Sequence, residues 1–210
     1  MATKLRLFND ALLHLGERKL SALTENRAPR RALDDAYESA VNYCLEQGFW
    51  KFAVRTAKLT PSQSLTPAFG YDNAFEKPTD NVRLYKICSD DLLQSPILDF
   101  SEEGAFWMAH DSIIYVAYVS NAANYGADLS LWPETFSKYV ALYLSCAVRE
   151  RVAPAVNQDR LENDRDKALS NAQAKDAMKG PTAFPPPGSW RGIRNGRSRR
   201  ERGNRGSLIG

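Results

Sequence analysis

The sequence predicts an α+β fold: an antiparallel bundle of about four helices with a small antiparallel β insertion between the second and third helices. Three observations predict it. Apolar residues recur at helical spacing near both ends of residues 1–179. Between these ends, residues 50–120 are rich in β-forming and aromatic side chains and in turn signals. After Lys179, Gly, Pro and Arg dominate, which predicts a flexible basic C-terminal tail over 180–210.

The first two helices are expected at about 4–15 and 29–47. The first has an apolar stripe on one face, with Thr3 as its N-cap and Gly16 as the residue that ends it. The second begins at Pro29, since proline is favoured in a first turn, and Gly48 is expected to end it. A short polar connector between them predicts that the two helices pack antiparallel.

The segment that follows is expected to form a small antiparallel sheet or a pair of hairpins. Its apolar and polar residues alternate in short runs, and Pro, Gly, Asn and Asp separate these runs. The expected strands are 51–59, 68–76, 82–88, 96–100, 105–109 and 112–119.

Helical spacing returns at Trp132 and predicts helices at about 132–152 and 157–179. Ser130 is expected to cap the first of these helices, and Pro154 to stop it. Asn157 is expected to cap the second, which is mostly charged with a thin apolar seam and should lie at the edge of the bundle. The predicted organisation is therefore a body over 1–179 and a basic arm over 180–210.

The net charge of +3 hides an asymmetry between these two parts. Residues 180–210 hold seven Arg, one Glu and no Lys or Asp, a formal charge of +6. The body holds 21 basic and 24 acidic residues, a formal charge of −3. Arginine neutralises phosphates and its plane stacks on bases, so the arm is a candidate for nucleic-acid contact. Docking on an acidic protein surface, or an idle solubilising tail, are the alternatives.

Composition excludes several classes of protein. A hydrophobic content of 43% excludes a wholly disordered chain. The longest uncharged run, Ser112–Ala127, is too short and too polar to span a bilayer, and the N-terminus lacks the apolar run of a signal peptide. Cys44, Cys88 and Cys146 are odd in number and far apart, which predicts free, reduced thiols.

The sequence gives no motif for a catalytic residue, a metal or a cofactor. Its two histidines, His14 and His110, have no Cys or His at metal-ligand spacing. It holds no glycine-rich phosphate loop and no nucleophile elbow. We therefore predict a protein that is not an enzyme and that has no cofactor and no metal.

Several short motifs together resemble the head-to-tail connector, or adaptor, proteins of tailed bacteriophages, the group that includes tail tubular protein A. Asn9–Glu17 is similar to the family's N-x-A-L-x-x-L-G-E opening, and Gly48–Phe52 to its G-W-x-F after a long helix. Tyr71, Pro78, Asp80 and Val82–Leu84 resemble its Y-x-L-P-x-D-x-L-R-V segment, although Lys77 stands where an apolar residue is usual. The remaining similar segments, in family order, are Tyr115–Val119, Trp132–Phe136, the Ala-rich last helix, and Phe184 with Gly188–Arg191. Beyond about Asn195 no counterpart is found.

The resemblance implies a structural virion protein at the head-tail junction, made in the host cytoplasm. Such proteins form a ring, a dodecamer, beneath the portal protein; the ring extends the channel for double-stranded DNA, which passes without sequence recognition, and carries the tail or nozzle protein below. The motif positions it marks as structural are Gly16, Glu17, Gly48, Trp50, Pro78 and Asp80. The candidate arm residues for docking on the portal or a neighbouring subunit are Phe184, Trp190, Arg191, Arg194 and Arg197.

Two other functions stay open at this point. One is a nucleic-acid-binding protein that acts through its Arg/Gly-rich arm. The other is a different tail-completion or stopper component of similar helical build. No membrane partner is expected.

Overall fold

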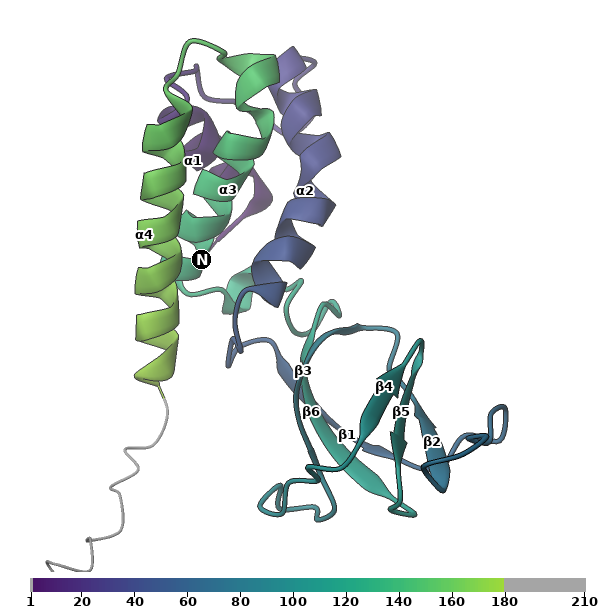
Figure 1. The fold of residues 1–210 in the computed structure, drawn as a ribbon. Helices are drawn as coiled ribbons and strands as arrows, with labels where there is room; N and C mark the ends of the chain where they lie inside the picture. The colour runs from purple at the N-terminus through teal and green to yellow at the C-terminus, as the bar shows by residue number, and fades with distance from the viewer. Residues whose placement is uncertain (1, 180–210) are drawn as a thin grey trace, which may run out of the picture. The chain divides into compact units, whose positions relative to one another are not determined.

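The computed structural model describes residues 2–179, in which four α-helices flank six strands along the chain (Figure 1). The helices are α1 (Lys4–His14), α2 (Ala28–Glu46), α3 (Glu134–Val152) and α4 (Gln158–Ala177). The strands are β1 (Val54–Leu59), β2 (Asn73–Glu76), β3 (Asn81–Cys88), β4 (Ser101–Glu103), β5 (Phe106–Ala109) and β6 (Ile114–Ser120). A mixed fold of four helices and small antiparallel sheets is therefore confirmed.

Helix α3 packs against each of the other three helices, and Figure 1 shows it in the middle of the group. Its apolar residues are buried on nearly all sides, from Phe136 to Val148. Phe8 and Leu12 of α1 and Leu33 of α2 are fully buried in the same cluster. Helix α4 contributes the buried side chains of Leu161, Ala168 and Ala172 to this cluster, and Leu169 packs against it partly buried, as the thin apolar seam of the helix predicts.

The strands form two three-stranded antiparallel sheets, in the orders β1-β6-β3 and β2-β5-β4. The sheets share an apolar cluster of their own, to which both contribute fully buried side chains, among them Phe75, Trp107, Val116 and Tyr118. The sequence predicts a small antiparallel insertion. The structure has two sheets with a core of their own instead.

The strand expected at 96–100 is wrong. Only an isolated bridge between Cys88 and Pro96 forms there, and Leu98 is 89% exposed. A strand lies instead at β4, between the strands expected at 96–100 and 105–109, and the chain reverses at Gly104 in the left-handed region (φ +53°). Leu92, Ile97 and Leu98 make this part of the chain apolar, but only Ile97 packs against the core of the sheets, and the other two side chains are exposed.

Several predicted helix ends are confirmed. Thr3 Oγ1 accepts a hydrogen bond from the Arg6 N–H, and Asn157 Oδ1 accepts one from the Arg160 N–H. Gly16 has a left-handed φ of +72° after α1. The prediction that Ser130 caps α3 is wrong, because Pro133 is the residue that precedes this helix. Ser130 lies inside a 3-10 turn, Leu129–Leu131, and its N–H donates to Oδ1 of Asp128.

The three cysteines are free, as expected. Cys44 and Cys88 are buried and Cys146 is half-buried. Burial raises the pKa of the Cys44 thiol to about 12, so this side chain behaves as a small apolar group of the core.

Candidate docking site at the end of helix α2

The segment that follows α2 holds the motif Gly48–Phe52, and its anchor is Trp50. The indole of Trp50 is 1% exposed and donates its N–H to the Cys44 carbonyl at 3.0 Å. Its ring meets Phe136 of α3 nearly edge to face, with centroids 4.8 Å apart. Trp50 therefore fixes the chain against the helices just before it enters β1.

Gly48 is required by this packing. A Cβ atom at position 48 would lie 2.9 Å from Cε2 of Trp50, closer than two such atoms can approach. Helix α2 does end just before Gly48, as predicted, but Gln47 closes it in a right-handed conformation. Gly48 does not have a left-handed φ, so backbone conformation does not require a glycine here. The glycine is needed because the indole of Trp50 lies too close for a Cβ atom.

Side chains from β3 and α4 bind the last carbonyls of α2. Arg83 donates to the Glu46 carbonyl at 2.7 Å, and Gln173 donates to the Gln47 carbonyl at 2.8 Å. Carbonyls at a helix C-terminus have no partner within the helix, and cationic side chains are favoured there. These two bonds connect the end of α2 to one sheet and to the last turns of α4.

A reciprocal pair of contacts joins this segment to the end of α4. The Lys51 N–H donates to Oδ2 of Asp176 at 3.1 Å, and Lys51 Nζ donates to the Ala177 carbonyl at 3.2 Å. Asp176 is 6% exposed. Within residues 2–179, its other oxygen, Oδ1, is buried without a hydrogen-bond partner.

A surface hollow of about 770 Å³ lies among these contacts. Phe49 and Tyr85 stand at it, 42% and 50% exposed, with ring centroids 5.0 Å apart. The guanidinium of Arg83 lies 4.3 Å from the centre of the Phe49 ring, a cation–π contact. The hollow thus combines exposed aromatic walls with one buried carboxylate, Asp176, whose hydrogen bonding is incomplete.

A second group of motif residues surrounds Asp80, directly before β3. Its carboxylate accepts hydrogen bonds from Arg55 at 2.9 Å, from the Tyr118 hydroxyl at 3.2 Å and from the Ser120 hydroxyl. Burial raises the pKa of Asp80, but these three donors outweigh burial and leave the pKa below its usual value. Burial and the Asp80 charge raise the pKa of Tyr118 to about 12, so its hydroxyl stays a donor.

Pro78 precedes this group in the turn between β2 and β3. Its carbonyl accepts a hydrogen bond from the Asn81 N–H at 3.0 Å, which closes the turn. Asp80 and its donors therefore join the turn to β1 and β6.

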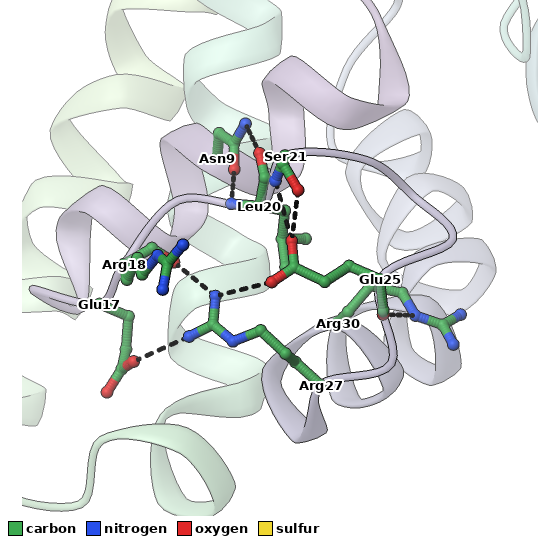
Figure 2. A network of polar contacts seen from close by, with 8 residues as sticks. All are labelled: Asn9, Glu17, Arg18, Leu20, Ser21, Glu25, Arg27 and Arg30. Carbon is green, nitrogen blue, oxygen red and sulfur yellow. Dashed lines mark hydrogen bonds and ion pairs between the residues drawn. The ribbon is translucent and has the colours of Figure 1, made fainter.

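Figure 2 shows the third place where motif residues gather, the connector between α1 and α2. The side chain of Asn9 bonds both backbone groups of Leu20, at 2.7 Å to the N–H and 3.1 Å to the carbonyl. Arg27 lies between the carboxylates of Glu17 and Glu25, each 3.8 Å away, and also donates to the Arg18 carbonyl. Glu17 thus has a structural place in the connector.

The motif positions lie in three separate regions: Gly16 and Glu17 in the connector, Gly48 and Trp50 after α2, and Pro78 and Asp80 before β3. The arm positions Phe184, Trp190, Arg191, Arg194 and Arg197 lie outside the described residues. Arg83, Tyr85 and Asp176 were missed by reasoning from the sequence. The one available signal was an acidic residue in the last turn of a helix, where the helix dipole disfavours it.

Over residues 2–179, no group of three His, Cys, Asp or Glu side chains is placed to hold a metal ion. In the same range, no helix is both long and apolar enough to cross a membrane. No protein-family model matches the chain, and no curated protein matches it.

Proposed function

We propose that this chain is a head-to-tail adaptor of a tailed bacteriophage. Copies of it form a ring, a dodecamer, beneath the portal protein at the head-tail junction of the virion. The ring extends the channel for double-stranded DNA and provides the platform for the tail or nozzle protein. In this proposal the helices are an antiparallel bundle that builds the ring, and the β segment is its insertion.

One observation carries the proposal: motifs similar to those of the adaptor family follow in family order from Asn9 to Arg191. The contacts of these residues support it, because the motif residues each contribute to local structure. Asn9 holds the connector, Trp50 fixes the chain after α2, and Asp80 bonds donors on two strands. Such roles are what shared motifs of a structural family require.

The exposed apolar side chains of the body support a role in protein contacts. Phe69, Leu92 and Leu98 are 90%, 70% and 89% exposed, and all three belong to loops of the β segment. A ring closes through a heterologous interface, so each subunit needs two different complementary faces. The body charge of −3 suits a conduit through which phosphates slide without binding.

The test is co-sedimentation of the full chain with the portal protein encoded in the same phage genome. We expect a stable complex, which a variant lacking Gly180–Gly210 forms at least tenfold more weakly while its circular dichroism spectrum stays that of a folded protein. A full chain that does not bind the portal would contradict the adaptor function. Equal binding by the truncated variant would contradict the role of the arm alone.

The charge of 180–210 favours a second candidate, a nucleic-acid-binding protein. Its signature is an affinity of the full chain for DNA or RNA that falls steeply with salt and is lost when the arm is removed. A monomer with that behaviour, and without portal binding, would favour this alternative.

A further inference from the structure

We propose that the hollow at the end of α2 receives residues 184–191 from a second copy of this chain, with Trp190 against Phe49 and Tyr85 and Arg191 paired with Asp176. The inference rests on the proposed ring and names the contact by which one subunit holds the next.

The first reason to place a partner in this hollow is the incomplete hydrogen bonding of Asp176. It is buried in the last turn of α4, where the partial negative charge of the helix end opposes a carboxylate. Only one of its oxygens is used, by the Lys51 N–H; Oδ1 has no partner within residues 2–179. A buried polar atom without a hydrogen bond is costly to the fold, so this side chain is poorly explained by the body alone. A donor that arrives from outside would complete it.

The carboxylate can meet such a donor with little movement. Asp176 itself lines the hollow, and rotation about the last side-chain bond of an aspartate is soft. Lys51 and Gln173 stand beside it in the lining, and both are flexible side chains. A guanidinium suits this position because its planar fork matches a carboxylate and keeps its charge.

The second reason to place a partner in this hollow is the exposure of its aromatic walls. Phe49 and Tyr85 leave large parts of their rings exposed at a cavity of about 770 Å³, although aromatic side chains of this size contribute most when they are covered. Arg83 already lies over one face of Phe49. A large flat side chain that entered beside these rings would be buried between aromatic and aliphatic groups, as interface anchors are.

The arm contains a large aromatic side chain and a guanidinium next to each other, at Trp190 and Arg191. Three of the four tryptophans of the chain, Trp50, Trp107 and Trp132, are buried in the body, and Trp190 is the fourth. Arg191 follows it directly, within a segment of formal charge +6 that holds a single acidic residue. Trp190 thus supplies a flat ring for the exposed rings, and Arg191 supplies a donor for Asp176, the one acidic side chain of a lining that also holds Lys51 and Arg83.

Chain length permits a contact with a neighbouring subunit. Trp190 follows Ala177, which lines the hollow, by thirteen positions along the chain, a span of at most about 45 Å when extended. A compact domain of about 180 residues measures about 40 Å across. In a ring, an arm that reaches the hollow of the next copy gives the head-to-tail contact that closes by rotation.

The experiment places a photo-crosslinking benzoylphenylalanine at position 49 of the full chain, mixes it with an isotope-labelled copy, and assembles the mixture on the portal. We expect mass spectrometry to join position 49 of one copy to residues 184–191 of the other. The same probe at Phe69, which is 90% exposed and does not line the hollow, should give no crosslink to that segment.

Two substitutions test the ion pair. Asp176→Asn and Arg191→Ala should each lower the crosslink yield at least fivefold, while Asp166→Asn, an exposed change on the same helix, leaves it unchanged. The amide oxygen of the first variant still accepts the Lys51 N–H, so its melting temperature should stay equal to or above that of the wild type. A large fall in melting temperature with an unchanged crosslink would assign Asp176 to the fold and overturn the proposal.

The outcomes separate this inference from the proposed function. Rings without a crosslink to 184–191 overturn the inference and leave the adaptor function intact. A crosslink only within single copies also overturns it, because the contact would then be internal. If no ring forms on the portal, the adaptor function fails and the inference fails with it.

Discussion

Asp80 shows how one carboxylate can organise the strands around it. It lies directly before β3, its side chain is 15% exposed, and its three donors come from β1 and β6. Hydrogen bonds to a charged group are stronger than neutral ones, and a partly buried position limits screening by solvent. The motif residue is thus explained by the sheet that it joins.

Replacement of Asp80 by Asn should lower the free energy of unfolding by about 1.5–3 kcal/mol near neutral pH. The folded pKa of Asp80 lies below its usual value, so the stabilisation is present above about pH 4 and is lost as pH falls through the folded pKa. Urea unfolding of both proteins at about pH 7 and at acid pH should show the difference shrinking at low pH. Asp72→Asn is the control, because Asp72 is exposed and, among residues 2–179, pairs only with His110; a difference for Asp80→Asn that does not change with pH would contradict this account.

Gly48→Ala should destabilise the protein by about 1–3 kcal/mol, because the new methyl group must displace a buried indole. The cost should be smaller when Trp50 is already replaced by Phe, whose ring is shorter. A double-mutant cycle by thermal unfolding measures this coupling. Equal costs in the two backgrounds would show that the contact with Trp50 is not the reason for the glycine.

At this scale the sequence predicts what local chemistry decides. Thr3, Gly16 and Asn157 were assigned correctly because capping depends on the nearest few residues. The reason for Gly48 was not predictable, since it depends on how Trp50 turns back onto the chain. The incomplete bonding of Asp176 was not predictable either, because it depends on a segment 125 residues away along the chain.

At the scale of elements, the connector between α1 and α2 is held mainly by polar contacts. Leu20 is 3% exposed, and Asn9 satisfies both of its backbone groups. Around it, Ser21 donates to Glu25 through both its N–H and its hydroxyl, and these bonds hold the pKa of Glu25 below its usual value. The connector therefore has a defined path although it contains no regular structure.

Asn9→Ala should release this path at a cost of about 1–3 kcal/mol, because it leaves the backbone groups of Leu20 partly buried and unpaired. Hydrogen exchange of the Leu20 amide should accelerate at least tenfold. Asn26→Ala is the matched control, since the side chain of Asn26 accepts exposed bonds from Arg31, and it should change stability by less than about 0.5 kcal/mol. Unchanged exchange at Leu20 would contradict the assigned role of Asn9.

The helices were the predictable elements and the short strands were less so. Periodicity over eleven or more residues indicates a helix strongly, and all four helices lie where it placed them. The strands have three to eight residues, and their pairing is decided by distant partners. For this reason a strand was predicted at 96–100, whereas Ser101–Glu103 pairs with β5 despite its two glutamates.

At the scale of the whole molecule, the number of helices was predictable from the sequence and the extent of the β segment was not. Composition and periodicity predicted an α+β protein with about four helices, but not two sheets with a shared core, since that core depends on which strands face each other. The three separate motif regions could be named from the sequence. The hollow beside Phe49 could not, because it is lined by residues of β3 and of the end of α4, which lie far apart in the sequence.

The central claim is a closed ring of this chain on a portal. Electron microscopy of the full chain assembled with the portal protein of the same phage tests it most directly. We predict class averages with an additional twelvefold ring of density beneath the portal and an open central channel. Portal particles without that ring, at concentrations at which the chain is folded and in excess, would contradict the claim.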